Sequence, residues 1–448
     1  MALDGTTDPF GKDIWLAGAY DQLEQTPGLF FNLVDQAEPE RIDGRNTYFK
    51  VVIGDSLGDA SIGSGGDFPA PVDPEYAEAT VTMDRNAHTI GLTFDEWEKL
   101  NREPTAAVPI VAEKMKRGVQ KMTRELARKT LMDGSATLAR CGTTSAALDV
   151  VLQSSDGSAG SANQYDRDRW NWLVARRARV DIVNATTGAA ITNGSNRTIV
   201  SVDKSANTIT LDTAGGVVTT SSSHVVTWSG SVADFSSGSY VSGEFEGLGA
   251  MMKTSRTYLG INSATAGNEY WDPITVSGAT SGTNEPITTG RFLRLVQELA
   301  DTAEDGMEPT SERGYCLFSN FGVCNHALQQ LQSHVRYIDP KTSEKPDITG
   351  GWRKVDGFGI EWYADVHYSH NVLDMLHKPS IKFVRPKEPM NDILDFVTLG
   401  NGSIWHLANA SSGQGHSAAV RAYLTGLFGL MTYRPNVHGR LDDIVELS

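Results

Sequence analysis

The sequence predicts an α+β protein with a long two-stranded arm and a small all-β insertion. Three observations lead to this prediction. Two strand-like runs are joined by a tip rich in glycine and proline, a long amphipathic helix follows, and several short strands recur at roughly ten-residue spacing. The chain has 448 residues, enough for about two to four structural units.

Composition excludes several classes of protein. A hydrophobic content of 40% argues against a disordered protein. A net charge of -16 argues against a protein whose whole surface binds nucleic acid, although local basic patches stay possible. Three cysteines suit a reducing compartment and give no disulfide framework. No secretory signal or membrane-spanning run is recognisable, so we expect a soluble protein made in the cytoplasm.

The amino-terminal segment 1–46 is polar with scattered aromatic residues, and we expect it to lie over a body rather than form a domain. In the arm, residues 47–53 and 78–83 are the expected strands, and the glycines and prolines between them can form neither a helix nor a central strand. An isolated ribbon is marginal in water, so its apolar side chains are expected to be covered by another copy of the chain. The predicted inter-subunit contacts are Phe49, Val51, Ile53, Phe68, Val81 and Met83.

After the arm, Thr93 and Glu96 form a capping box that predicts a short helix ended by Pro104. A longer helix is predicted over 109–132, with Pro109 in its first turn and Gly134 after its end. One side of this helix is apolar, and a basic stripe lies roughly 140° away. The stripe consists of Lys114, Arg117, Lys121, Arg124 and Arg128. Such a stripe is either a solvated face or a contact for a polyanion or an acidic neighbour.

Strands at 180–182, 199–202, 209–211 and 225–228, separated by turn residues, predict a small all-β insertion over 173–232. The insertion fits either a binding module or a stabilising decoration. Further along, a helix that begins near Phe292, a strand at 315–318 and a helix capped by Asn320 are expected. Strands at 359–362, 381–384 and 420–433 complete an α+β second half.

No catalytic, cofactor-binding or metal site is predicted. The segment 247–254 lacks the glycine that a phosphate-binding loop places before its lysine, and Ser56 lacks the helix that follows a nucleophile elbow. A metal site at His367, His370 and His377 would need a helix that the sequence does not favour.

The cysteines do not suggest a thiol centre. Cys324 lies on the apolar face of its expected helix, so a buried structural thiol is favoured over a site with Cys316 and His326.

The order of these parts resembles the major capsid protein of tailed bacteriophages, which has the Hong Kong 97-like fold. Two local sequences are similar to the family as well: Gly357-Phe358-Gly359-Ile360, at the entry to a strand, and the aromatic-Arg-Pro step Tyr433-Arg434-Pro435 after the last long strand. The resemblance implies an N-terminal arm (1–46), an extended loop (47–92), a peripheral domain (93–172) with its spine helix (109–132), the β insertion (173–232), a peripheral continuation (233–290), an axial domain (291–395) and return strands (396–448).

The resemblance also implies a function. The chain is expected to be a non-enzymatic capsid protein without a cofactor that forms hexamers and pentamers of an icosahedral shell around phage double-stranded DNA. The basic stripe would face inward and contact DNA without reading its sequence. The shell would be part of the virion and would assemble in the host bacterial cytoplasm.

Expected partners are other copies of the chain, a portal and decoration proteins. Because 1–46 shows no heptads, a separate scaffold protein is expected. No lysine occurs between Lys50 and Lys99, so no isopeptide cross-link is expected from the arm tip. Alternative interpretations are an encapsulin-type nanocompartment shell and a multidomain hydrolase with a β carbohydrate-binding insert.

Overall fold

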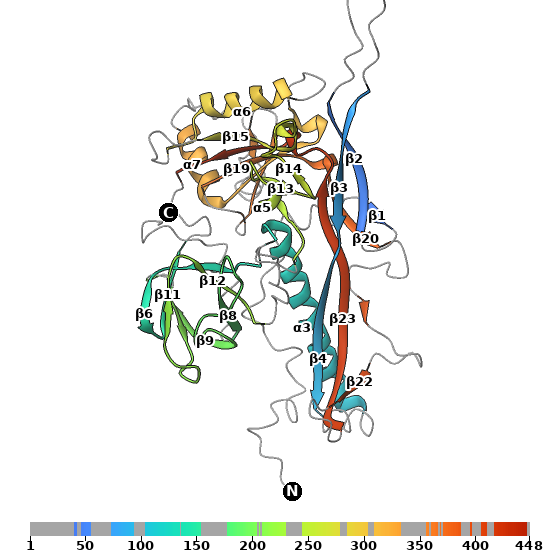
Figure 1. Ribbon diagram of the computed structural model, residues 1–448, viewed down its shortest axis with the longest axis vertical. Helices are drawn as coiled ribbons and strands as arrows, with labels where there is room; N and C mark the ends of the chain where they lie inside the picture. Colours follow the sequence, from blue (N-terminus) through green and yellow to red (C-terminus); the bar gives the residue numbers. More distant parts are fainter. Residues whose placement is uncertain are drawn as a thin grey trace, which may run out of the picture.

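The computed structural model contains two mixed sheets, a closed barrel, a long helix and a two-stranded ribbon (Figure 1). It describes residues 40–42, 46–54, 73–93, 104–134, 136–153, 177–203, 206, 208–229, 244–277, 285–302, 309–332, 355–357, 360–365, 368, 371–386, 395–396, 405–409 and 416–445.

The first sheet, here called the β23 sheet, is organised by the long strand β23 (His416–Thr432). Its other strands are β1 (Glu40–Ile42), β4 (Asp84–Thr93), β20 (Ile381–Pro386), β21 (Asp395–Phe396) and β22 (Trp405–Asn409). β4, β20, β21 and β22 pair with β23 antiparallel, and β1 lies parallel to β20. The predicted strand at 420–433 is therefore confirmed and is the centre of this sheet.

The arm is the ribbon of β2 (Asn46–Gly54) and β3 (Glu75–Thr82), which pair antiparallel as the alternating sequence predicts. The predicted extended loop 47–92 is too long, because residues 84–92 belong to β4. That strand pairs with β23 from Asp84 opposite Phe428 to Thr93 opposite Ala419. Thr93 thus ends a strand, and the expected helix after it lies outside the described residues.

The second sheet, here called the β16 sheet, has the strand order β15-β24-β19-β16-β18-β17. Its strands are β15 (Ile274–Ser277), β16 (Tyr315–Ser319), β17 (Val355–Gly357), β18 (Ile360–Ala364), β19 (Leu373–His377) and β24 (Gly439–Asp442). The axial boundaries 291–395 are wrong at both ends, because β15 joins this sheet from before residue 291 and β20 belongs to the β23 sheet.

Helices α6 (Thr289–Thr302) and α7 (Phe321–Gln332) share a hydrophobic core with the β16 sheet. Both were predicted, and the side chain of Asn320 accepts a hydrogen bond from the Gly322 amide at 3.0 Å, as a cap does. α6 approaches β24 so closely that a Cβ atom at Gly439 would lie 2.7 Å from Leu299. Glycine at this position permits the contact.

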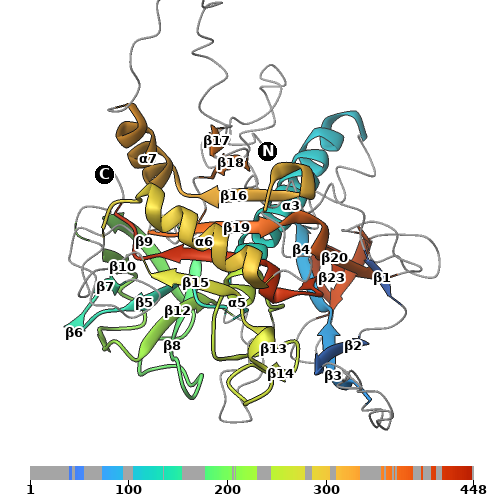
Figure 2. The same ribbon diagram turned by 90° about the horizontal axis from the view of Figure 1, so that it is seen from above.

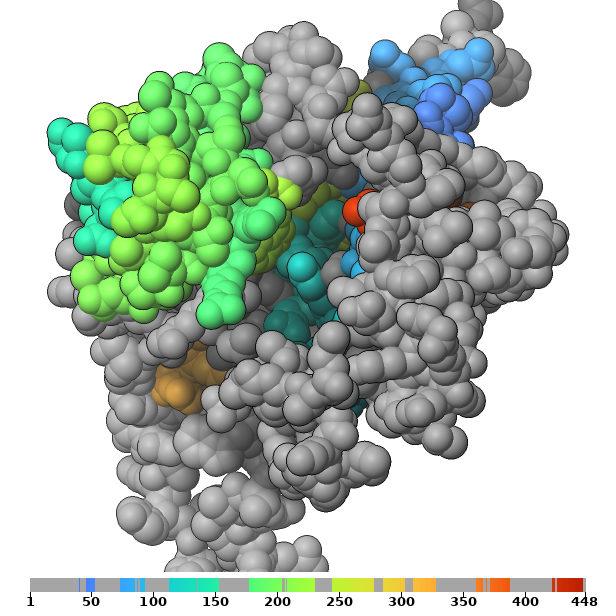
Figure 3. Space-filling view, turned by 90° about the horizontal axis from the view of Figure 1, so that it is seen from below, coloured from blue at the N-terminus to red at the C-terminus, as the bar shows by residue number. Residues whose placement is uncertain are grey.

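The barrel closes in the order β10-β7-β5-β12-β8-β9. Its strands are β5 (Ala139–Cys141), β7 (Asp149–Gln153), β8 (Arg179–Asn184), β9 (Arg197–Asp203), β10 (Thr208–Leu211) and β12 (His224–Trp228). Beside it, β6 (Thr144–Ala147) pairs with β11 (Val218–Thr220). The four predicted strands are confirmed, but the boundary at 173 is wrong because β5 and β7 close the barrel from earlier in the chain. Figure 3 shows the barrel as one continuous body with part of the long helix visible beside it.

The long helix α3 (Pro104–Leu131) has 28 residues, a length of about 42 Å. It starts five residues earlier than predicted, so Pro104 is its first residue and Pro109 lies inside it. Its first half extends away from the barrel (Figure 2). A short helix, α5 (Leu248–Met251), the hairpin β13 (Thr257–Tyr258) and β14 (Ile261–Asn262), and the 3-10 turns η1 (Glu269–Trp271) and η2 (Ser311–Arg313) complete the regions around the sheets.

Candidate assembly surfaces

One face of the arm packs on its own chain. Phe49 lies 5.2 Å from Tyr433 and 6.4 Å from Trp271 between ring centroids. Ala79, opposite Phe49, is fully buried, and the β13–β14 hairpin covers the edge of β3, with the Thr80 amide donating to the Leu259 carbonyl at 2.7 Å. The base of the arm is therefore part of the body of the protein.

This packing corrects the predicted inter-subunit contacts. Val81 and Met83 are completely buried within the chain, so the prediction that another copy covers them is wrong. Phe49 and Val51 are half-buried against the same core. Phe68 and the side chain of Ile53 lie outside the described residues.

The opposite face of the arm is open to solvent and carries large apolar side chains. Tyr48 is 60% exposed, Val52 55% and Tyr76 53%. Between them, Lys50 lies directly opposite Glu78 in the register of the two strands, and the Lys50 ammonium lies 5.8 Å from the centre of the Tyr76 ring. The sequence did not show which face of β2 is exposed, because both faces carry apolar residues. That positions 48, 50 and 52 alternate along the strand, and therefore lie on one face, was the available indication.

The basic stripe of α3 is divided by the structure. Arg117 and Lys121 are exposed, and Arg117 pairs with Glu113 at 2.8 Å. Lys114 and Arg124 are half-buried, and the Lys114 ammonium donates to the Gly91 carbonyl at 3.3 Å. Lys116, next to Arg117, is exposed as well. The exposed positive charge is thus concentrated in the middle of the helix.

Arg128 is not part of that surface. Its side chain is 0% exposed and forms ion pairs with Glu244 and, at 3.0 Å, with Glu125. Burial acts to lower the pKa of Arg128, but the two carboxylates outweigh it, so the pKa is raised. The prediction that Arg128 faces a polyanion is wrong, because a carboxylate more than a hundred residues away already neutralises it.

The same cluster attaches the barrel to α3. The indole of Trp228, at the end of β12, donates to the Glu125 carboxylate at 3.1 Å. Lys129 lies 3.7 Å from Glu244, and burial lowers the pKa of this lysine although Glu244 opposes the effect. Burial acts to raise the pKa of Glu244, but Arg128 and Lys129 reverse this and lower it. The charged form of Glu244 is therefore favoured inside the protein.

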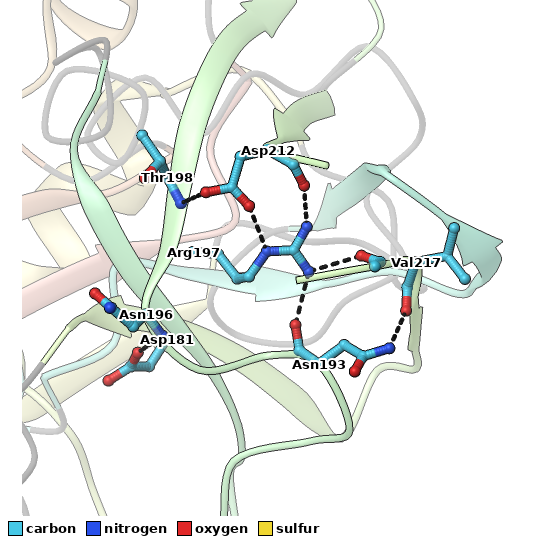
Figure 4. Close-up of polar contacts among 8 residues, drawn as sticks. Asp181, Asn193, Asn196, Arg197, Thr198, Asp212 and Val217 are labelled. Carbon is cyan, nitrogen blue, oxygen red and sulfur yellow. Dashed lines mark hydrogen bonds and ion pairs between the residues drawn. The ribbon is translucent and has the colours of Figure 1, made fainter. Parts of the chain in front are cut away.

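A second buried arginine, Arg197, organises one end of the barrel (Figure 4). It is 1% exposed and donates to the Asp212 carboxylate at 2.9 Å and to the carbonyls of Asn193 and Gly216 at 2.7 and 2.8 Å. It also donates to the Asp212 carbonyl. Because one planar side chain satisfies carbonyls from two turns, it fixes these turns relative to each other.

The residues considered for chemistry do not form a reactive centre in the part of the chain that the structure describes. No group of three or more His, Cys, Asp or Glu side chains is placed there to hold a metal ion. His367 and His370 lie outside the described residues, as does Ser56. The imidazole of His326 bonds to the Val445 carbonyl at 2.9 Å, and Cys316 donates to the Leu376 carbonyl.

Gly247 has a packing role. A Cβ atom there would lie 2.7 Å from the Thr130 carbonyl, so the glycine lets α5 lie against the end of α3. Among the described helices, none is long and apolar enough to cross a membrane.

Comparison with solved structures reveals the fold. The chain is similar to a chain of the Cyanophage A-1(L) capsid asymmetric unit, with a TM-score of 0.54, 11% identity and coverage of 96% of both chains. Lower similarities include the capsid of a native GTA particle (TM-score 0.44, 9% identity, 99% of this chain and 100% of that one) and the holo-SrpI encapsulin complex from Synechococcus elongatus PCC 7942 (TM-score 0.41, 7% identity, 99% and 96%). No family model and no curated protein matches the sequence.

The first of these similarities extends over nearly the whole chain, so the protein has the α+β fold of a phage capsid protein, as the sequence predicted. At 11% identity the similarity defines the fold and assigns no residue. Whether the barrel is an insertion into that fold stays a prediction.

Proposed function

We propose that this chain is a major capsid protein that self-assembles into hexamers and pentamers of an icosahedral shell around phage double-stranded DNA. The observation that carries the proposal is the fold shared with a cyanophage capsid chain over 96% of both chains. Fold alone does not fix function, and the arm supplies a second, independent argument.

The outward face of the arm supports the proposal because it is an apolar surface on a projecting ribbon. Tyr48, Val52 and Tyr76 are each more than half exposed. Large apolar side chains gathered on one exposed face mark interaction sites, and an arm that leaves the body can reach a neighbour. We expect another copy of the chain to cover this face, with Lys50 and Glu78 among the polar contacts at its centre.

The exposed part of the basic stripe supports contact with DNA. Arg117 and Lys121, with Lys116 beside them, present positive charge on α3, while the whole chain carries a net charge of -16. Local positive charge on an acidic protein fits contact with phosphates that does not depend on base sequence. In this proposal the shell belongs to the virion, assembles in the host bacterial cytoplasm, and needs a separate scaffold, a portal and possible decoration proteins.

The test is electron microscopy with light scattering on the purified chain, alone and with a scaffold protein encoded beside it. We expect ring-shaped capsomers or closed shells, and nuclease-resistant DNA in particles from infected cells. A chain that stays monomeric under both conditions would contradict the proposal. Shells that hold protein cargo and no nucleic acid would instead support the nanocompartment function.

A further inference from the structure

The two sheets are connected at one place by two chain segments that cross side by side. β19 passes through η3 (Lys378–Ser380) into β20, and β23 passes through η4 (Pro435–Val437) into β24. β19 pairs with β24 in the β16 sheet, and β20 pairs with β23 in the β23 sheet. In Figure 1, β23 runs along the long axis and β19 runs across it, so the double-stranded path bends sharply here.

The backbone ladder is interrupted at this bend. Its last pair on one side is Ile381 with Thr432, and its first pair on the other side is Met375 with Gly439. The imidazole of His438 lies in the gap and is 0% exposed. It takes the place of the missing ladder bonds between the two crossing segments.

The imidazole contacts both segments through both of its nitrogens. Nδ1 accepts a hydrogen bond from the backbone amide of His377 at 3.2 Å. Nε2 lies 3.1 Å from the hydroxyl of Ser380 and 3.2 Å from that of Thr432. One side chain on the β23–β24 crossing therefore binds the β19–β20 crossing at two points.

These partners define the protonation state. Because Nδ1 accepts an amide N–H, the proton of the neutral ring lies on Nε2 and is donated to a hydroxyl oxygen. Ser380 uses its own proton to donate to the His377 carbonyl at 2.8 Å, which leaves its oxygen free to accept from Nε2. The neutral imidazole is thus satisfied on both sides.

A second proton would break this arrangement. It would have to sit on Nδ1, where it would meet the N–H of His377, and it would create a buried charge. The charged or titratable groups around the site include the rings of His377 and Tyr315, 5.0 Å apart. The guanidinium of Arg434 acts on both rings, and that of Arg313 acts on Tyr315. Among the described residues, no carboxylate contacts His438. Burial, with a smaller effect of His377, lowers the pKa of His438 to about 3.

We propose that His438 is an acid-sensitive clamp between the two sheets. In its neutral form it holds the two crossing segments together, and when it takes up a proton in a transient opening it releases them. The sheets are then free to change their relative angle while each stays folded. This inference concerns the single chain and does not depend on shell assembly.

The test is hydrogen exchange on the purified full chain between pH 7 and pH 4.5, with protection corrected for the intrinsic pH dependence of amide exchange. The opened imidazole has an ordinary pKa of about 6.5, so protection in 377–381 and 432–439 is expected to fall about tenfold per pH unit below it. Protection in the barrel is expected to change much less. A crossing whose protection does not depend on pH would overturn the proposal, and this wild-type profile is decisive on its own.

Three variants identify the responsible group. His438→Gln keeps an N–H donor but cannot take up a proton, so the pH dependence at the crossing is expected to disappear. His377→Gln tests the neighbouring ring and is expected to retain it. His224→Gln, in the barrel, is the matched control, because this histidine also accepts an amide N–H at Nδ1, at 3.1 Å. The proposal would be contradicted if His438→Gln kept the pH dependence of protection at the crossing, or if His377→Gln lost it.

Discussion

The guanidinium of Arg128 and the carboxylate of Glu244 form an ion pair inside the protein, although 116 positions separate them in the sequence. Glu125 binds the same guanidinium and also accepts a hydrogen bond from Trp228. Through Glu125 and Arg128, α3 is joined to the last barrel strand and to the segment that follows the barrel. The carboxyl-terminal end of the barrel is thus anchored to this helix.

Replacing one member of this pair is expected to destabilise the protein strongly. Arg128→Met leaves Glu244 buried without its arginine partner and with Lys129 3.7 Å away, and breaking a buried pair costs about 3 to 5 kcal/mol. The free energy of unfolding, from denaturant titration, measures the loss. Arg117→Met is the control on the same helix, since its exposed pair with Glu113 is worth less than about 1 kcal/mol. Equal effects of the two substitutions would contradict this account.

The outward face of the arm is expected to control assembly without affecting folding. Tyr48→Ser combined with Tyr76→Ser removes apolar area that another copy would bury, so the concentration needed for shells is expected to rise at least about tenfold. Light scattering against concentration measures it, and an unchanged melting temperature shows intact folding. Tyr270→Ser is the control, because Tyr270 is exposed but lies in η1 outside the arm. Normal assembly of the double variant would exclude this face as a contact.

The exposed charge on α3 is expected to hold DNA. Arg117→Glu with Lys121→Glu replaces attraction to phosphate by repulsion, so particles are expected to retain less DNA and to lose it at lower salt. The ratio of absorbance at 260 and 280 nm in purified particles measures the content. Arg294→Glu, at an exposed position of α6, changes charge elsewhere and is expected to have little effect. Full packaging by the α3 variant would show that this stripe is only a solvated face.

Close packing of α5 on α3 is expected to depend on Gly247. In Gly247→Ala the new methyl group would overlap the carbonyls at the end of α3, and such overpacking costs about 1 to 3 kcal/mol. Thermal unfolding measures the change. Gly290→Ala, in α6, has nothing within 4 Å of the added Cβ atom and is expected to be neutral or slightly stabilising. A neutral Gly247→Ala would show that α5 can move away without cost.

The three thiols are expected to be unreactive in the native protein. Burial raises the pKa of Cys141 and Cys316 to about 12 and that of Cys324 to about 11. At pH 8 almost no thiolate is present, so Ellman's reagent is expected to react slowly with all three until denaturant is added. A thiol that reacts within seconds in the folded chain would contradict their burial.

Local sequence predicted the elements whose signals repeat over many residues. The amphipathic pattern located α6 and most of α3, and the alternating runs located β2, β3 and β23. Strands β5 and β7 escaped prediction, because β5 has only three residues and β7 carries the unbroken apolar run Val150, Val151 and Leu152, which has no alternation. They are strands because β12 and β10 pair with them.

For the candidate surfaces, too, local sequence predicted some features and only the fold decided others. Spacing placed Arg128 in one stripe with Lys121, seven positions earlier, and parity placed Val81 and Met83 on one face of the arm. Only the fold decided that Glu244 neutralises Arg128 and that the chain itself buries Val81 and Met83, leaving Tyr48 and Tyr76 exposed.

The sequence by itself thus determined which residues are helical or extended and which side chains share a face, because these depend on neighbours a few positions away. The tertiary structure decided which face is covered and which charge is paired. Those outcomes depend on segments such as β23 and Glu244, which arrive from far along the chain and leave no local pattern where they make contact.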